Sequence, residues 1–153
     1  MAVNPNVEFV SGDILLASQQ NRFPRGVMGY VVRGSGNVAL TTTPADITGL
    51  SITFTAEANR GYKIIFNSTV QKDGTAGYGV FQVTDASNVI SFEIVQGMTS
   101  NGYTTVALSQ ILTGLTAGSK TLKMRGFVNA TTATLLASVD NKTTFAIEDI
   151  GPV

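Results

Sequence analysis

From Asn37 to the end of the chain, apolar and polar residues alternate with a period of two, and this pattern constrains the fold more than any other feature. Leu50, Ile52 and Phe54 alternate with serine and threonine residues, and the segment from Ile90 to Ile94 repeats the pattern. A half-buried strand produces it because successive side chains point to opposite faces of a sheet. Turn signals separate the runs at intervals of roughly 8–14 residues, the spacing of an all-β sandwich or barrel.

We therefore expect an all-β fold: an antiparallel, jelly-roll-like β-sandwich of about 8–10 strands. A fixed-period repeat is absent, which argues against a propeller or solenoid. Asp73-Gly74 and Asn101-Gly102 carry hairpin signals, since these dipeptides supply the positive φ angles of tight turns. Four apolar side chains are expected in the core: Phe54, Phe66, Phe92 and Leu122.

The first thirty-six residues differ from the rest and predict a division into an N-terminal arm or attachment segment, 1–36, and a β-sandwich domain, 37–153. Ile14 to Asn21 is expected to form one short helix, which Asp13 caps and Pro24 ends. Val27 to Val32 is apolar on both faces and is expected to be a buried strand. The N-terminus has neither a basic start nor an apolar core, so we expect no secretion signal and synthesis in the cytoplasm.

Two predicted strands are apolar on both faces, Ile64-Ile65-Phe66 and Gly79-Val80-Phe81. One face of an antiparallel sandwich normally meets water, so something is expected to cover the outer one. A second copy of the chain is the simplest cover, and a loop or the N-terminal arm is the alternative. Charged residues make up only 13% of the chain and cancel to a net charge of zero. Low charge of this kind favours a homo-oligomer over a freely dispersed monomer.

Residue types that carry chemistry are scarce. The chain has no histidine, the commonest proton shuttle, and no cysteine, the readiest nucleophile and soft-metal ligand. Glu148 and Asp149 are adjacent in a predicted strand, so they point to opposite faces and cannot work as a carboxylate pair. Asp73, Asp85 and Asp140 lie in turns without a calcium-loop spacing. We expect no catalytic, cofactor-binding or metal-binding residues, no cofactors and no enzymatic activity.

Charge and hydropathy also limit the partners. Ten basic and ten acidic residues cancel, and the densest cationic stretch places Lys123 and Arg125 on one strand face with Lys120 on the other. A nucleic-acid partner is therefore not expected. A membrane partner is not expected either, because no apolar run approaches the ~20 residues of a membrane span. A glycan ligand stays possible, although the four tyrosines are scattered along the chain.

Four segments in sequence order resemble a known family. The run GDILLASQQNRFPRGVMGY, Gly12 to Tyr30, resembles the opening of small virion structural proteins of tailed phages, especially phages of actinobacteria. The segments DITGLSITFTAEANRGYKI and LTGLTAGSKTLKMR resemble the core strands of that family, and IEDIGP, Ile147 to Pro152, resembles its C-terminal signature. The chain departs from the family at Leu16, where the family tends to have a helix-capping threonine.

The resemblance implies a non-enzymatic structural protein of a tailed-phage virion, exposed on the exterior of the particle. Such proteins are capsid decoration proteins or minor tail proteins, and related sandwiches often form trimers. The partners implied are further copies of the chain and either the major capsid protein or the tail proteins of the bacteriophage. A carbohydrate- or receptor-binding β-sandwich that acts in host-cell recognition is the alternative function.

Overall fold

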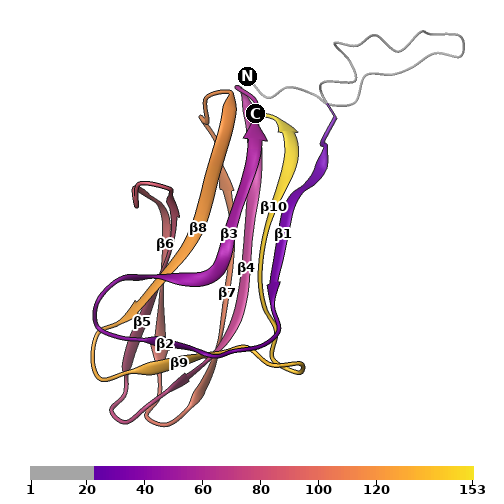
Figure 1. The fold of residues 1–153 in the computed structure, drawn as a ribbon. Helices are drawn as coiled ribbons and strands as arrows, with labels where there is room; N and C mark the ends of the chain where they lie inside the picture. The colour runs from indigo at the N-terminus through magenta and orange to yellow at the C-terminus, as the bar shows by residue number, and fades with distance from the viewer. Residues whose placement is uncertain (1–22) are drawn as a thin grey trace, which may run out of the picture.

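The computed structural model describes residues 23–153, in which ten strands form two antiparallel sheets packed face to face (Figure 1). The predicted helix at Ile14–Asn21 lies outside the described residues. The first sheet contains β1 (Gly26–Arg33), β10 (Thr143–Pro152), β4 (Arg60–Lys72), β7 (Tyr103–Leu112), β9 (Ala133–Leu136) and β2 (Val38–Leu40). The second sheet contains β3 (Ala45–Ala56), β8 (Gly118–Val128), β5 (Gly77–Asp85) and β6 (Ile90–Met98), in that order.

The strand pairing is nested, which defines a jelly roll. β1 pairs with β10, β3 with β8, β4 with β7 and β5 with β6, so the chain resembles one long hairpin wrapped over itself. β4 is the central strand of the first sheet: β7 occupies one edge, and β10 and β9 share the other. The predicted all-β, jelly-roll-like sandwich is confirmed.

The core lies between the sheets and follows the alternation that the sequence predicts. Phe66 of β4 and Phe81 of β5 meet across the two layers, with ring centroids 5.8 Å apart. Phe54, Phe66 and Leu122 are buried as expected. Phe92 is only half-buried, because it belongs to β6, which pairs with β5 alone and forms an edge of the second sheet.

The two predicted hairpins are wrong. The turn with Asp73-Gly74 joins β4 in the first sheet to β5 in the second, and the turn with Asn101-Gly102 joins β6 back to β7 across the layers. Gly74 and Asn101 do adopt positive φ angles of 66° and 52°. One residue of each dipeptide therefore has the predicted positive φ, but four residues separate the strands, and a positive φ does not determine whether the next strand stays in the same sheet.

β1 is an edge strand and not the buried strand that its composition predicts. Val27, Tyr30 and Val32 on its outer side are 63%, 58% and 43% exposed. Its inner side packs on β3 so closely that a Cβ on Gly29 would lie 2.2 Å from the Ile52 Cγ2 atom. The predicted arm, 1–36, thus includes a strand that pairs with β10 along Gly26–Arg33.

Candidate functional site

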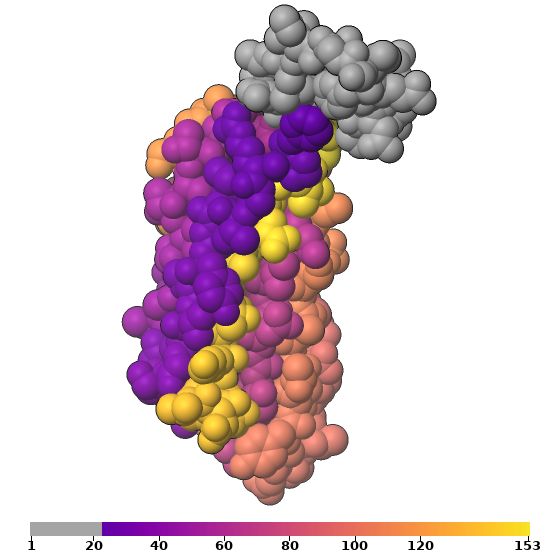
Figure 2. Space-filling view, turned by 90° about the vertical axis from the view of Figure 1, so that its right-hand side faces the viewer, coloured from indigo at the N-terminus to yellow at the C-terminus, as the bar shows by residue number. Residues whose placement is uncertain are grey.

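The outward side of the first sheet is the candidate interaction surface, and we call it the first-sheet face. Figure 2 looks onto it, with β1, β10, β4 and β7 side by side. It consists of the outward residues of these four strands. They are Val27, Tyr30, Val32, Lys63, Ile65, Asn67, Thr69, Gln71, Tyr103, Thr105, Ala107, Ser109, Ile111, Thr144, Ala146 and Glu148.

Rows of this face run across all four strands. One row joins Tyr30, Ala146, Ile65 and Ser109, which are successive partners in the ladder. These side chains are apolar or small, and most of the remaining rows hold threonine, alanine, valine or amide side chains. Eight of the sixteen residues of this face are apolar or aromatic, and only Lys63 and Glu148 are charged. A broad sheet surface with so few charges can form a protein–protein contact.

The outward side of the second sheet differs in charge. Asp46 forms ion pairs with Lys123, at 2.8 Å, and with Arg125, at 3.1 Å. On the neighbouring strands Gln82 donates a hydrogen bond of 2.7 Å to Glu93. The cations Lys123 and Arg125 of this side are paired with the Asp46 carboxylate, so the two faces of the sandwich are chemically distinct.

A hollow of about 320 Å³ lies at one end of the second sheet, between the β5–β6 turn and the loop before β8. Leu115 and Leu122 form part of an apolar wall, and Asp85 and Lys120 bring opposite charges to the same space. Lys120 donates a hydrogen bond of 2.7 Å to Thr116. The hollow has the size and mixed lining of a site for a small polar ligand.

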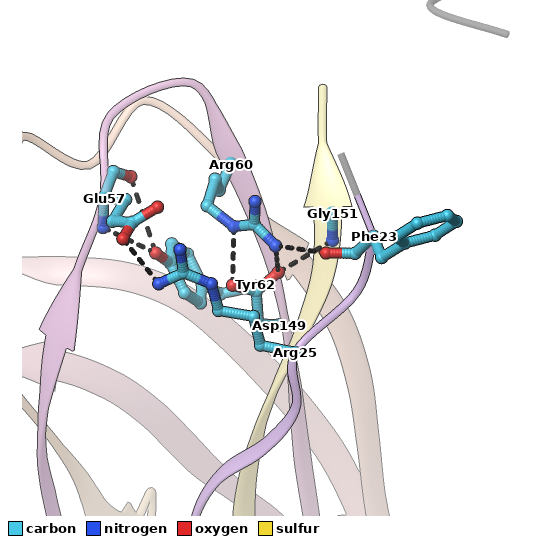
Figure 3. A network of polar contacts seen from close by, with 7 residues as sticks. All are labelled: Phe23, Arg25, Glu57, Arg60, Tyr62, Asp149 and Gly151. Carbon is cyan, nitrogen blue, oxygen red and sulfur yellow. Dashed lines mark hydrogen bonds and ion pairs between the residues drawn. The ribbon is translucent and has the colours of Figure 1, made fainter. Parts of the chain in front are cut away.

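A buried polar network fastens the end of the sandwich where β1 begins (Figure 3). Arg60 of β4 donates two hydrogen bonds to Asp149 of β10, from Nε at 2.6 Å and from Nη2 at 2.8 Å. Nη2 also donates to the Phe23 carbonyl, at 2.7 Å, and the Gly151 amide donates to Asp149. Close by, Arg25 forms an ion pair with Glu57. The network joins the segment before β1 to the first sheet.

The contact between Arg60 and Asp149 shifts the pKa values of both side chains. The hydrogen bond to Asp149 raises the pKa of Arg60 above its usual value, against the opposing effect of burial. Burial alone would raise the pKa of Asp149, but the hydrogen bonds from Arg60 and Gly151 outweigh it and leave the pKa below its usual range. Both groups are therefore held in their charged forms.

At the opposite end, the ammonium group of Lys72 is fully buried. It donates to the carbonyls of Ala130, at 2.8 Å, and Thr132, at 2.9 Å, and to the Thr131 hydroxyl. Thr131 has a φ of 52°, an unfavourable angle for a β-branched residue. Lys72 therefore holds the β8–β9 loop in shape by hydrogen bonds alone.

The sequence did not predict either buried cation, although a signal exists. Arg60 and Lys72 occupy the same alternation phase as the buried Tyr62, Ile64 and Phe66, so both must point into the sandwich. A charged residue in the apolar phase of a strand indicates a buried partner. In the same way, Asp149 follows the phase of Phe145 and Ile147.

The residues that the sequence singled out do not assemble into a site. Glu148 and Asp149 point to opposite sides of β10, as predicted. Asp85 accepts hydrogen bonds from the amides of Ser87 and Val89 in its own turn. Among residues 23–153, no group of three or more histidine, cysteine, aspartate or glutamate residues is placed to hold a metal ion. The same part of the chain holds no helix long and apolar enough to cross a membrane.

Comparisons with known proteins identify similar folds only. No family model matches the chain, and no curated protein matches it. A structure of infectious bursal disease virus, Gx strain, aligns with a TM-score of 0.43 and 7% identity over 97% of this chain and 47% of that chain. The globular domain of zebrafish complement 1qA protein aligns with a TM-score of 0.41 and 14% identity, over 81% and 93%. The chain thus spans about half the length of the viral protein, and similarity at this level carries no conclusion about function.

Proposed function

We propose that the chain is a non-enzymatic structural protein of a tailed-phage virion, exposed on the exterior of the particle as an oligomer, most simply a trimer. It would act as a capsid decoration protein or a small minor tail protein, bound to the major capsid protein or to tail proteins. The resemblance of Gly12–Tyr30 and Ile147–Pro152 to small virion proteins supports the phage assignment. We propose residues 1–36 as the attachment segment, with β1 shared with the sandwich.

The proposed oligomer is supported mainly by the size of the first-sheet face. Four strands at ~4.8 Å spacing are roughly 19 Å wide, and ten residues at ~3.3 Å each are roughly 33 Å long. The resulting area of about 600 Å² is comparable with the ~800 Å² that each partner buries in a specific interface. The exposed Tyr30 and Tyr103 are the aromatic type that such contacts favour.

Light scattering over a range of concentrations tests the oligomer. We expect a mass three times the 16.0 kDa of one chain. Tyr30→Glu places a charge on the first-sheet face and should give monomers, because a buried unpaired charge opposes association. Thr55→Glu, on the exposed side of β3 in the second sheet, is the matched control and should keep the wild-type mass. A wild-type monomer at all concentrations contradicts the proposal.

Electron microscopy of the parent particle, with this protein labelled, separates the two virion locations. Label over the head shell supports the decoration protein, and label on the tail supports the minor tail protein. Absence of label from purified particles contradicts the virion assignment as a whole, whatever the oligomeric state.

Carbohydrate binding is the second candidate function, and the hollow beside Asp85 and Lys120 favours it. Ser91, Ser119 and Thr121 line it together with the apolar wall, and this mixture of polar and apolar residues suits a sugar ring. A glycan array followed by calorimetry tests this function. Lys120→Ala should abolish any binding, and Lys142→Ala, an exposed lysine outside the hollow, should not.

A further inference from the structure

The first-sheet face contains only two charged residues among its outward positions, Lys63 and Glu148. They are direct cross-strand partners, Lys63 on β4 and Glu148 on β10. Each is half-buried, and their row continues to Val27 on one side and Ile111 on the other. One positive and one negative charge therefore stand side by side within an otherwise uncharged surface.

Neither charge has a partner within residues 23–153. The ion pairs of this part of the chain join Arg25 to Glu57, Arg60 to Asp149, and Asp46 to Lys123 and Arg125. Cross-strand neighbours have Cβ atoms about 5 Å apart, close enough for an ion pair, yet the two charged ends do not meet. Burying either charge alone in an interface would be costly.

We infer that Lys63 and Glu148 set the register of self-association: Lys63 of one copy pairs with Glu148 of the next copy. This inference rests on the proposed oligomer and names its partner, a second copy of this chain. Lys63 and Glu148 carry opposite charges, so Lys63 of each copy can meet Glu148 of its neighbour, either about a twofold axis or head to tail around a threefold axis. Val27 and Ile111 at the ends of the row would then exclude water from the pair.

Mixing two charge-reversed variants distinguishes an ion pair between two copies from an ion pair within one chain. Lys63→Glu has two negative charges on the face, and Glu148→Lys has two positive charges. On dilution, the oligomer of each single variant should dissociate at a concentration about tenfold or more above the concentration at which the wild-type oligomer dissociates. The reason is that like charges meet at the contact. Mixed in equal amounts, the two variants should reassemble, because the negative face of one chain then meets the positive face of the other.

The extent of recovery also reports the symmetry. A twofold pair satisfies both contacts in the mixture, so recovery should be complete. A threefold ring of two kinds of chain always keeps one contact between like chains, so recovery should be partial. The double variant Lys63→Glu/Glu148→Lys should assemble like the wild type and controls for folding, and Lys142→Glu, outside the face, controls for net charge.

Light scattering on the full chain and its variants has three possible outcomes for the pairing of Lys63 with Glu148. Weak single variants with a recovering mixture support the pairing. Single variants that assemble like the wild type, or a mixture no better than its components, overturn the pairing but leave the oligomer intact. A wild-type chain that never associates overturns the proposed oligomer and the pairing with it.

Discussion

The guanidinium of Arg60 and the carboxylate of Asp149 meet in two hydrogen bonds, of 2.6 and 2.8 Å, across the pairing of β4 with β10. Their side chains are only 4% and 1% exposed. A buried pair of this kind costs desolvation energy when it forms, but removing one partner costs more because the other charge stays buried alone. The pair also holds the Phe23 carbonyl, so it links the start of the described chain to the centre of the first sheet.

Replacing Asp149 by asparagine should destabilise the protein by about 3–5 kcal/mol at neutral pH, because the buried charge of Arg60 loses the carboxylate that compensates it. The pKa of Asp149 is lower in the folded state than the ~3.9 of a free aspartate. The stabilisation is therefore present above about pH 4 and is lost as the pH falls through the folded-state value. Urea unfolding of both chains from pH 7 to pH 3 should show the gap between them closing. A gap that stays constant contradicts the assignment.

Phe66→Ala should cost about 3–5 kcal/mol of unfolding free energy, since Phe66 is fully buried against Phe81. Phe92→Ala should cost clearly less, because Phe92 stands half-exposed on the edge strand β6. Denaturant titration of the two variants measures the difference. Equal costs would mean that the edge of the second sheet is covered in solution.

Lys72→Met removes the donor that satisfies carbonyls of the β8–β9 loop, and an unsatisfied buried acceptor costs about 1–3 kcal/mol. We expect lower stability and faster hydrogen exchange at the Asp73 amide, which donates to Thr132 of this loop. Lys142→Met is the control, as Lys142 is exposed. Unchanged exchange in Lys72→Met would show that the loop holds its shape without the ammonium group.

A chain that begins at Asn37 should be less stable than one that begins at Phe23, because it lacks β1. Met28 and Val31 of β1 are half-buried against the core, so the loss should be about 3 kcal/mol at roughly 1.5 kcal/mol for each. Circular dichroism should still show strand structure in the shorter chain. Equal denaturation midpoints would indicate that residues 26–33 belong functionally to the arm.

The sequence predicted the strands well because a half-buried strand has apolar residues on one face and polar residues on the other, and these alternate along the chain. The alternation around Ile52 and Phe54 indicated β3, and the alternation from Ile90 to Ile94 indicated β6. What alternation does not encode is which strand lies beside which. Asp73-Gly74 was therefore interpreted as a hairpin turn although it carries the chain from one sheet to the other.

The candidate surface was only partly predictable. Apolarity on both sides of Ile64-Ile65-Phe66 indicated that an outer face needs cover, and Ile65 does lie on the first-sheet face. Tyr30 and Ser109 of the same row come from distant parts of the chain, and only the three pairings among four strands bring them into line with Ile65. The placement of Lys63 opposite Glu148 depends on the pairing of β4 with β10, which no local pattern specifies.

The nested strand order brings the two ends of the described chain together, since the Phe23 carbonyl binds Arg60 and the Val153 amide binds Asn59 at the same β3–β4 end. The β9–β10 turn, where Val139 is 80% exposed, lies at the other end (Figure 1). A peptide inserted between Val139 and Asp140 would emerge at the opposite end of the sandwich from Phe23 and Val153. A molecule held at its β3–β4 end would therefore present such an insert at the opposite end of the sandwich.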